Sequence, residues 1–178
     1  PKTAKRRNLP APAWQVWLTA SLPVLMLLPF LDKAFHIDDT VYLRVAQQIQ
    51  HHPFDFFGFD MNRGTQSVPV SLFNKNPPLF SYFLVPFGML FGWNEWAMHG
   101  AQLIPTAFAA VGILRLAERM CATPLLASLI AVLTPAFLVS TSVVMCEPLM
   151  LALYVWSIVF WIDGTEKNHG SPYSSAQA

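Results

Sequence analysis

The fold is decided by the stretch Trp14–Leu31, which reads WQVWLTASLPVLMLLPFL and contains no charged residue. A membrane-spanning helix needs about 20 predominantly apolar residues, so this run is long enough to cross a bilayer once. It exceeds the usual apolar core of a signal peptide, and no small-residue cleavage site closes it. Pro23 and Pro29 lie inside the run, where neighbouring helices or water can satisfy the carbonyls that they free. The stretch therefore predicts a retained first transmembrane helix.

The composition extends this interpretation to the whole chain of 178 residues. Hydrophobic residues make up 54% and charged residues 12%, against about 25% charged in an average soluble protein. The apolar residues are gathered in long runs, which predicts an all-α, polytopic membrane helix bundle embedded in a lipid bilayer. The formal net charge of +1 gives no reason to expect a nucleic-acid partner. Cys121 and Cys146 do not indicate a disulfide framework.

The sequence shows neither the ligand spacing of a metal site nor a glycine-rich phosphate loop. The adjacent histidines His51 and His52 could ligate a metal, but no companion ligands follow at useful spacing, which favours a polar helix end. The sequence therefore predicts no cofactor, and a divalent metal stays an alternative that the spacing does not support.

Basic residues at the N-terminus set the orientation of the spans. Cytoplasmic segments carry an excess of Lys and Arg, so the cluster within residues 1–13 predicts a cytoplasmic N-terminus. The apolar segment Leu79–Phe91 is short for a span, and a crossing there would leave Arg115 and Arg119 on the non-cytoplasmic side. We therefore expect this segment to lie in the membrane interface. The predicted topology comprises a basic N-terminus (1–13), spans at about 14–31, 97–117, 124–142 and 147–162, a non-cytoplasmic loop with surface-lying helices (about 32–96), and a polar, disordered tail (163–178).

A pair of acids, Asp38 and Asp39, follows the first span. Tyr42 and the apolar residues after it recur at helical spacing, so the pair is predicted to stand at the start of an amphipathic helix just outside the hydrocarbon. The topology places Glu147 on the same side, which brings three carboxylates to one membrane surface. Structural explanations stay open for both sites. Either aspartate can be an N-cap, and Glu147 can be an N-cap or a first-turn acid of a proline-started helix.

These features occur in an order that resembles the N-terminal module of the GT-C superfamily of membrane glycosyltransferases. More narrowly, the chain is similar to bacterial, protein-mannosyltransferase-like enzymes that use polyprenyl-phosphate sugars. The resemblance covers roughly Trp14–Gly164 and includes a second motif at Leu133–Met150. Its other elements are the basic N-terminus, the first span, Asp38 with Tyr42 four residues later, PPL at 77–79, FGWNEWAMH at 91–99 and RLAER at 115–119.

The resemblance implies an integral-membrane enzyme that transfers a sugar from a polyprenyl-phosphate carrier to an acceptor hydroxyl with inversion. Asp38 matches the catalytic acid position, with Asp39 beside it and Glu147 in the second motif. A carboxylate can take the proton of the incoming hydroxyl or orient the acceptor. The resemblance also implies a bacterial inner membrane, with the site facing the periplasm.

The departing phosphate needs a cation to neutralise its charge. Relatives often carry Lys or His directly before the Pro-Pro-Leu sequence, whereas this chain has Asn76 there and Lys75 one residue earlier. Arg63 and His99 are further candidates, the latter at a position where relatives often have Arg. The expected substrate and phosphate contacts are therefore Lys75, Asn76, Arg63, His99 and the motif residue Tyr42.

Complete enzymes of this type have several hundred residues and more spans, so we expect the chain to be an N-terminal portion or a short form. A non-catalytic membrane scaffold, or a degenerate remnant of the enzyme, is therefore the alternative function. A small transporter subunit fits the sequence less well. Transporters place ionisable groups near the bilayer midplane, whereas these acids lie at one surface.

Overall fold

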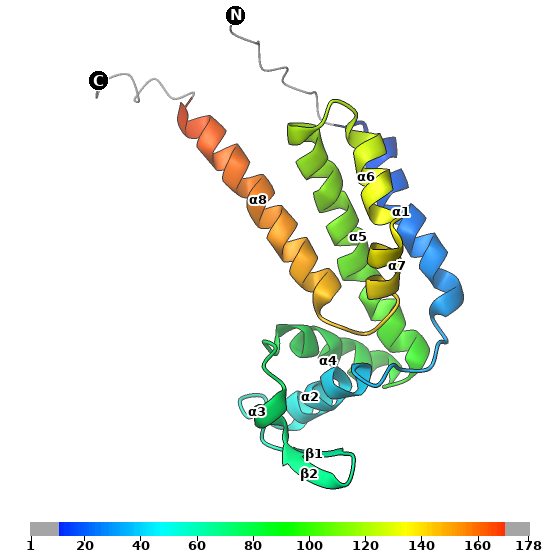
Figure 1. Ribbon diagram of the computed structural model, residues 1–178, viewed down its shortest axis with the longest axis vertical. Helices are drawn as coiled ribbons and strands as arrows, with labels where there is room; N and C mark the ends of the chain where they lie inside the picture. Colours follow the sequence, from blue (N-terminus) through cyan, green and yellow to red (C-terminus); the bar gives the residue numbers. More distant parts are fainter. Residues whose placement is uncertain (1–10, 170–178) are drawn as a thin grey trace, which may run out of the picture. The chain divides into compact units, whose positions relative to one another are not determined.

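The protein is predominantly helical, which confirms the predicted all-α class (Figure 1). A computed structural model describes residues 11–169, except for the side chains of residues 63 and 167–169. In this described part the strands are limited to an antiparallel hairpin of β1 (Asp60–Arg63) and β2 (Gln66–Pro69). The helices are α1 (Ala13–Leu27) with a 3-10 turn (Leu28–Phe30), α2 (Asp39–His51), α3 (Val70–Phe73), α4 (Leu79–Phe91), α5 (Glu95–Met120), α6 (Pro124–Val132), α7 (Pro135–Thr141) and α8 (Glu147–His169).

The described residues form two compact units. The bundle unit comprises residues 11–26, 105–138 and 148–169, and it contains most of the long helices. The acid-bearing unit comprises residues 27–104 and 139–147. It contains both predicted catalytic aspartates and Glu147, so the candidate site lies within one unit.

Three helices of the described part are long and apolar enough to cross a membrane, over Ala13–Phe30, Glu95–Met120 and Glu147–Glu166. A fourth crossing results if α6 and α7 are counted as one span. The described residues thus contain three or four candidate spans, as expected of an integral membrane protein. Helix α4 is apolar but has only 13 residues, and its place in the membrane interface stays a prediction.

The region predicted as one span, 124–142, consists of two helices, α6 and α7, at 57° to each other, which can be counted together as one bent span. Pro135 lacks a backbone N–H and disfavours helical geometry at the residue before it, which breaks the helix. The hydroxyl of Thr134 donates to the carbonyl of Ala131 at 2.8 Å and accepts from the N–H of Phe137 at 3.3 Å. The Thr134 side chain therefore forms one hydrogen bond at the end of α6 and another at the start of α7. Fewer backbone groups are then left unsatisfied in the lipid.

Helix α8 extends beyond its predicted end at residue 162. Residues 163–169 continue the helix, so this part of the predicted disordered tail is ordered. The carboxylate of Asp163 accepts two hydrogen bonds from the guanidinium of Arg119 on α5, at 2.8 and 2.7 Å, and this bidentate pair stabilises the added turn. Residues 170–178, and residues 1–10 with their basic cluster, lie outside the described residues.

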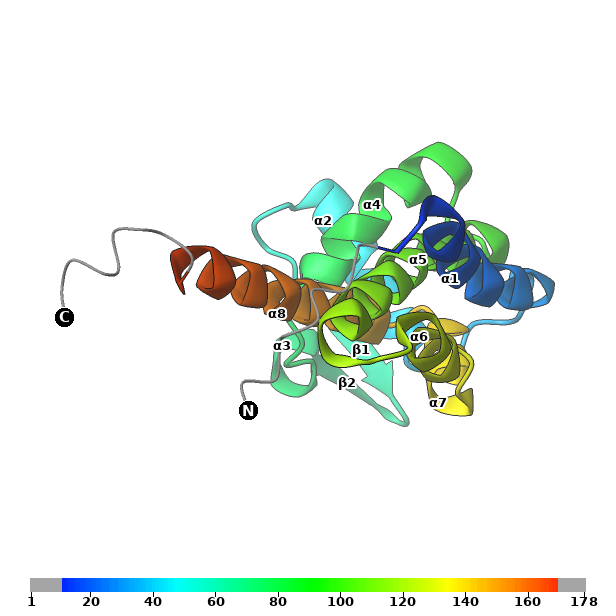
Figure 2. The ribbon, with the colours of Figure 1, turned by 90° about the horizontal axis from the view of Figure 1, so that it is seen from above.

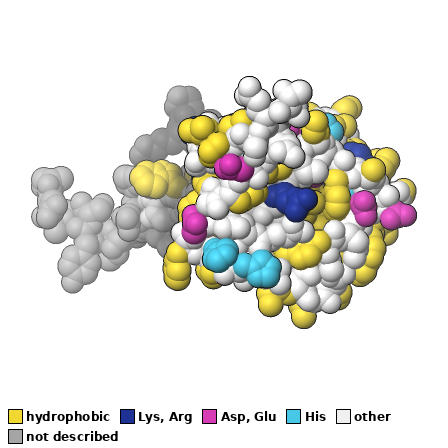
Figure 3. All heavy atoms as spheres, turned by 90° about the horizontal axis from the view of Figure 1, so that it is seen from below, with side chains coloured by type: hydrophobic (Ala, Val, Ile, Leu, Met, Phe, Trp, Pro, Cys, Tyr) yellow, Lys and Arg dark blue, Asp and Glu magenta, His cyan; other side chains and the backbone are white. Residues whose placement is uncertain are grey.

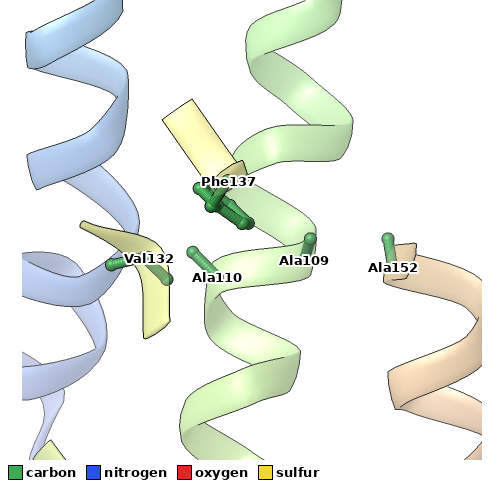
Figure 4. Packing of buried hydrophobic residues seen from close by; sticks show 5 residues of the cluster. All are labelled: Ala109, Ala110, Val132, Phe137 and Ala152. Atoms are coloured by element: carbon green, nitrogen blue, oxygen red, sulfur yellow. The ribbon is translucent and has the colours of Figure 1, made fainter. Parts of the chain in front are cut away.

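Small side chains let the helices of the bundle unit approach one another closely. Ala109 and Ala110 on α5 are buried together with Val132 on α6, Phe137 on α7 and Ala152 on α8 (Figure 4). Seen from above, α6 lies beside α5 (Figure 2). Membrane helices associate through such close packing, because the lipid around them is as apolar as their side chains.

Trp156 fixes α8 on α5. Its indole N–H donates to the carbonyl of Phe108 at 3.0 Å, and the two aromatic rings stack with centroids 5.1 Å apart. Gly112 provides the space for this indole, because a Cβ at that position would lie 3.0 Å from the Trp156 Nε1 atom.

In the acid-bearing unit, α2 packs against α4. The face of α2 that periodicity predicts to be apolar is buried, including Tyr42, Val45 and Ile49, whereas Arg44 is exposed. This prediction is confirmed. Val70 completes the buried cluster beneath the hairpin. Seen from below, acidic, basic and histidine side chains lie among exposed apolar ones (Figure 3).

Candidate functional site

The two adjacent acids at the start of α2 have opposite environments. Asp39 is fully buried, and both of its carboxylate oxygens accept backbone hydrogen bonds. One oxygen accepts from the N–H of His36 at 2.8 Å, and the other from the N–H of Val144 at 3.1 Å. Buried polar groups need such partners, because an unpaired one loses its hydration without replacement. Asp39 therefore joins the turn before α2 to the segment that leads to Glu147.

Asp38 points outward, and 57% of its side chain is exposed. It occupies the N-cap position of α2, but its carboxylate makes no capping hydrogen bond within the described residues. The ring of His36 lies beside it, with Nδ1 at 3.7 Å from Asp38 Oδ2. The capping explanation for this acid therefore finds no support, and its carboxylate is exposed to solvent.

The motif tyrosine ties three segments together. The hydroxyl of Tyr42 accepts a hydrogen bond from the amide of Asn76 at 2.7 Å and lies 3.2 Å from the thiol sulfur of Cys146. Because the amide nitrogen only donates, the hydroxyl proton is available to the sulfur. The backbone carbonyl of Tyr42 also accepts from Ser81 on α4 at 3.1 Å, and Phe80 packs edge-on against its ring. Tyr42 thus holds α2 against the segments before α4 and α8.

Burial is the main reason that the pKa of Tyr42 is raised well above its usual range, with contributions from Cys146 and from the charge of Glu147. Burial likewise raises the pKa of the Cys146 thiol, and Glu147 adds to the effect. Both groups therefore stay protonated at neutral pH. Glu147 is itself exposed at the first position of α8, so its carboxylate lies near this cluster and is accessible.

The predicted phosphate contacts differ in their availability. Lys75 is exposed, and its ammonium donates to the carbonyl of Ser71 at 2.7 Å. His99 is buried and stacked on Phe35, with ring centroids 5.7 Å apart. The Nδ1 atom of His99 bonds to the carbonyl of Glu95, whereas its Nε2 atom has no hydrogen-bond partner among residues 11–169.

Arg63 lies on β1, but its side chain falls outside the described residues. Within residues 11–169, no group of three or more His, Cys, Asp and Glu side chains is placed to hold a metal ion. Among the predicted phosphate contacts whose side chains the structure describes, Lys75 is therefore the exposed cationic side chain.

The structure brings the eight predicted site residues into one unit and adds two that the sequence reasoning missed. His36 precedes Asp38 by two residues, a spacing at which a side chain can accept from the backbone N–H, and this signal could have identified it. Cys146 gave no such signal, because its partner Tyr42 lies 104 residues away. The predicted residues located in the acid-bearing unit are Asp38, Asp39, Tyr42, Arg63, Lys75, Asn76, His99 and Glu147.

A family described as dolichyl-phosphate-mannose-protein mannosyltransferase matches residues 75–177, which is more than half of the chain. The matched region begins at Lys75 and includes Glu147, whereas Asp38 and Asp39 precede it. No curated protein and no solved structure matches the chain.

Proposed function

The chain belongs to the dolichyl-phosphate-mannose-protein mannosyltransferase family of GT-C-type membrane glycosyltransferases, and from this premise we propose that it transfers a sugar from a polyprenyl-phosphate carrier to an acceptor hydroxyl. The observation that supports this proposal best is the contrast between Asp38 and Asp39. One carboxylate is exposed and lacks a capping bond in the described part, while its neighbour is buried and holds the turn.

In the proposed reaction, Asp38 is the general base or the acid that orients the acceptor. The acceptor hydroxyl attacks the anomeric carbon as its proton passes to the Asp38 carboxylate, and the bond from that carbon to the phosphate oxygen breaks. A single displacement of this kind inverts the configuration at the sugar. A well-placed general base contributes about 10²- to 10⁴-fold to such a rate.

We assign Asp39 a positioning role in place of the catalytic one expected from the resemblance. Its two oxygens are already engaged with the backbone of His36 and Val144, so they are not available to an acceptor. Tyr42 and Asn76 act in the same way, by holding α2 against the segments before α4 and α8. Glu147, which is exposed, supplies a second carboxylate to accept a hydrogen bond from a sugar hydroxyl.

Lys75 is the proposed cation for the departing phosphate. Its flexible four-carbon stem lets the ammonium leave the carbonyl of Ser71, to which it donates in this structure, and turn to a phosphate oxygen. A buried His99 is less suited to a first contact with the carrier. We propose that the site lies on the non-cytoplasmic surface of a bacterial inner membrane and faces the periplasm. In this orientation Arg115 and Arg119, near the end of α5, lie on the cytoplasmic side.

The experiment uses the full-length membrane protein in lipid vesicles with radiolabelled polyprenyl-phosphate mannose. We expect Asp38→Asn to lower transfer by at least about 100-fold. The matched control is Asp32→Asn, which removes an exposed acid from the same loop and should leave transfer near the wild-type rate. Wild-type turnover by Asp38→Asn would disprove the role of this acid. Carrier binding without transfer by the wild-type protein would indicate the non-catalytic remnant instead.

A further inference from the structure

We propose that His36 receives the proton that Asp38 takes from the acceptor hydroxyl and passes it on to water, an inference that rests on the proposed transferase function. His36 then acts through Asp38 and does not contact the reacting sugar. Four observations on the turn before α2 support this role: the distance between the two groups, the state of the imidazole nitrogen, the anchoring of the turn, and the exposure of both side chains.

The imidazole of His36 faces Asp38 directly. The Nδ1 atom lies 3.7 Å from Asp38 Oδ2, and the side chains are 53% and 57% exposed, respectively. A small rotation of either side chain closes this gap to hydrogen-bond distance. Because both groups are half exposed, water can reach the far side of the imidazole ring, which a proton relay requires.

The hydrogen bonding indicates which nitrogen can take a proton. The backbone N–H of Asp38 donates to Nδ1 of His36 at 3.4 Å, so this nitrogen carries its lone pair and the neutral ring carries its proton on Nε2. The lone pair of Nδ1 therefore accepts this backbone N–H in the described structure, and it can turn to a protonated Asp38 carboxyl only when that bond breaks. The long bond from the backbone is weak and easily exchanged for a shorter one to a protonated Asp38.

The residues on either side of His36 are anchored, which confines the motion to the ring itself. The backbone N–H of His36 is held by the buried carboxylate of Asp39 at 2.8 Å. The ring of Phe35, one residue earlier, stacks on the buried ring of His99. On the other side, the hydroxyl of Thr40 donates to the carbonyl of Ile37 at 2.6 Å. The imidazole thus stands on a fixed backbone next to the acid.

The proposed transfer balances as follows. The acceptor oxygen forms a bond to the anomeric carbon, and the electron pair of the broken carbon–oxygen bond leaves with the carrier phosphate. The acceptor proton moves to Asp38 Oδ2 and then to Nδ1 of His36, which becomes an imidazolium. The imidazolium releases its Nε2 proton to water, and exchange with water restores the original tautomer. The second step regenerates the carboxylate of Asp38 for the next turnover.

A purely structural role for His36 makes a different prediction. In that case the ring would serve only as the acceptor for the N–H of Asp38, as Asn and Asp side chains do in tight turns. Asn at position 36 can provide this acceptor through its amide oxygen, but it cannot carry a proton. His36→Asn therefore preserves the turn and removes the relay, whereas His36→Ala removes both.

The test compares these two variants with the wild type in the full-length, vesicle-reconstituted protein, with His52→Asn as the matched control at an exposed histidine of the same unit. We expect both His36 variants to lower kcat by about tenfold or more, to change KM for carrier and acceptor by less than about twofold, and His52→Asn to match the wild type. Added imidazole should restore kcat in His36→Ala, where the side chain leaves space. Equal thermal unfolding midpoints confirm that the variants are folded.

A wild-type kcat in His36→Asn would overturn the relay, whether or not His36→Ala is impaired. The absence of transfer by the wild-type protein would overturn the proposed function, and this inference with it. The two failures are therefore distinguishable in one experiment.

Discussion

The carboxylate of Asp39 accepts a hydrogen bond from the backbone nitrogen of Val144 at 3.1 Å, across 105 residues of sequence. This bond joins the turn that carries the exposed Asp38 to the segment that ends at Glu147. The buried Asp39 therefore holds together the two segments that carry the exposed acids Asp38 and Glu147.

Replacement of Asp39 by Asn should destabilise the protein, because an amide offers one acceptor oxygen where two backbone N–H groups are to be satisfied. A buried donor left without a partner costs about 1–3 kcal/mol. Thermal unfolding in detergent should show a lower midpoint for Asp39→Asn and little change for Asp38→Asn, whose carboxylate is exposed. Equal midpoints for the two variants would show that the bonds of Asp39 contribute little.

Cys146 should react slowly with maleimide in the folded protein. Its thiol is buried, and burial raises its pKa, so both access and the thiolate fraction are reduced. Cys121, which is only half buried, should react faster. Mass spectrometry of the labelled protein before and after denaturation measures both sites. Rapid modification of Cys146 in the native state would contradict the packing against Tyr42.

Alkaline pH should weaken the folded state through Cys146 and Tyr42. Both groups have a raised pKa in the folded protein, so the unfolded chain releases its protons at a lower pH than the folded chain. As the pH rises through the ordinary thiol range, the unfolded state binds fewer protons and stability falls. The unfolding midpoint recorded against pH should decline less steeply in Cys146→Ala than in the wild type, and an identical decline would exclude this contribution.

Lys75 should affect the binding of the carrier more than the chemical step. We expect Lys75→Ala to raise KM for the polyprenyl-phosphate sugar by about tenfold, which is the loss of one charge-assisted contact of about 1.5 kcal/mol, and Lys75→Arg to retain part of the affinity. Lys33→Ala, at another exposed lysine of the same unit, is the control. If KM is unchanged in Lys75→Ala, the phosphate is held by another cation.

Gly112→Ala should destabilise the pairing of α5 with α8. The indole of Trp156 is fixed by its bond to Phe108 and by ring stacking, so it cannot yield to a Cβ at 3.0 Å. An overpacked site typically costs about 1–3 kcal/mol. At Gly100 on the same helix, a Cβ would meet no described atom within 4 Å, so Gly100→Ala should be neutral or stabilising. Unfolding midpoints of the two variants provide the comparison.

Local patterns in the sequence predicted local features of the structure. The apolar period of α2 identified its buried face, and the uninterrupted apolar runs identified the helices now found as candidate spans. The apolar run at 124–142 predicted one span, and the structure adds a bend of 57° before Pro135 that run length alone does not reveal. The tail was predicted to begin at 163 because its composition is polar, and the pairing of Asp163 with Arg119 could not be read from composition.

The internal contacts of the candidate site could not be predicted for a different reason. Asp39 bonds to two backbone N–H groups, and any residue except proline offers such a group, so the sequence carries no signature of the partners. The resemblance placed both aspartates in the site, but it could not tell which one would be buried.

The bond between Asp39 and Val144 also fixes an order of events during synthesis. The carboxylate leaves the ribosome 105 residues ahead of its partner, a delay of about 5–20 s at ordinary elongation rates. During this interval the acid remains hydrated, because burial without a donor would be costly. The bond that fixes the turn presenting Asp38 can therefore form only after Val144 has been synthesised.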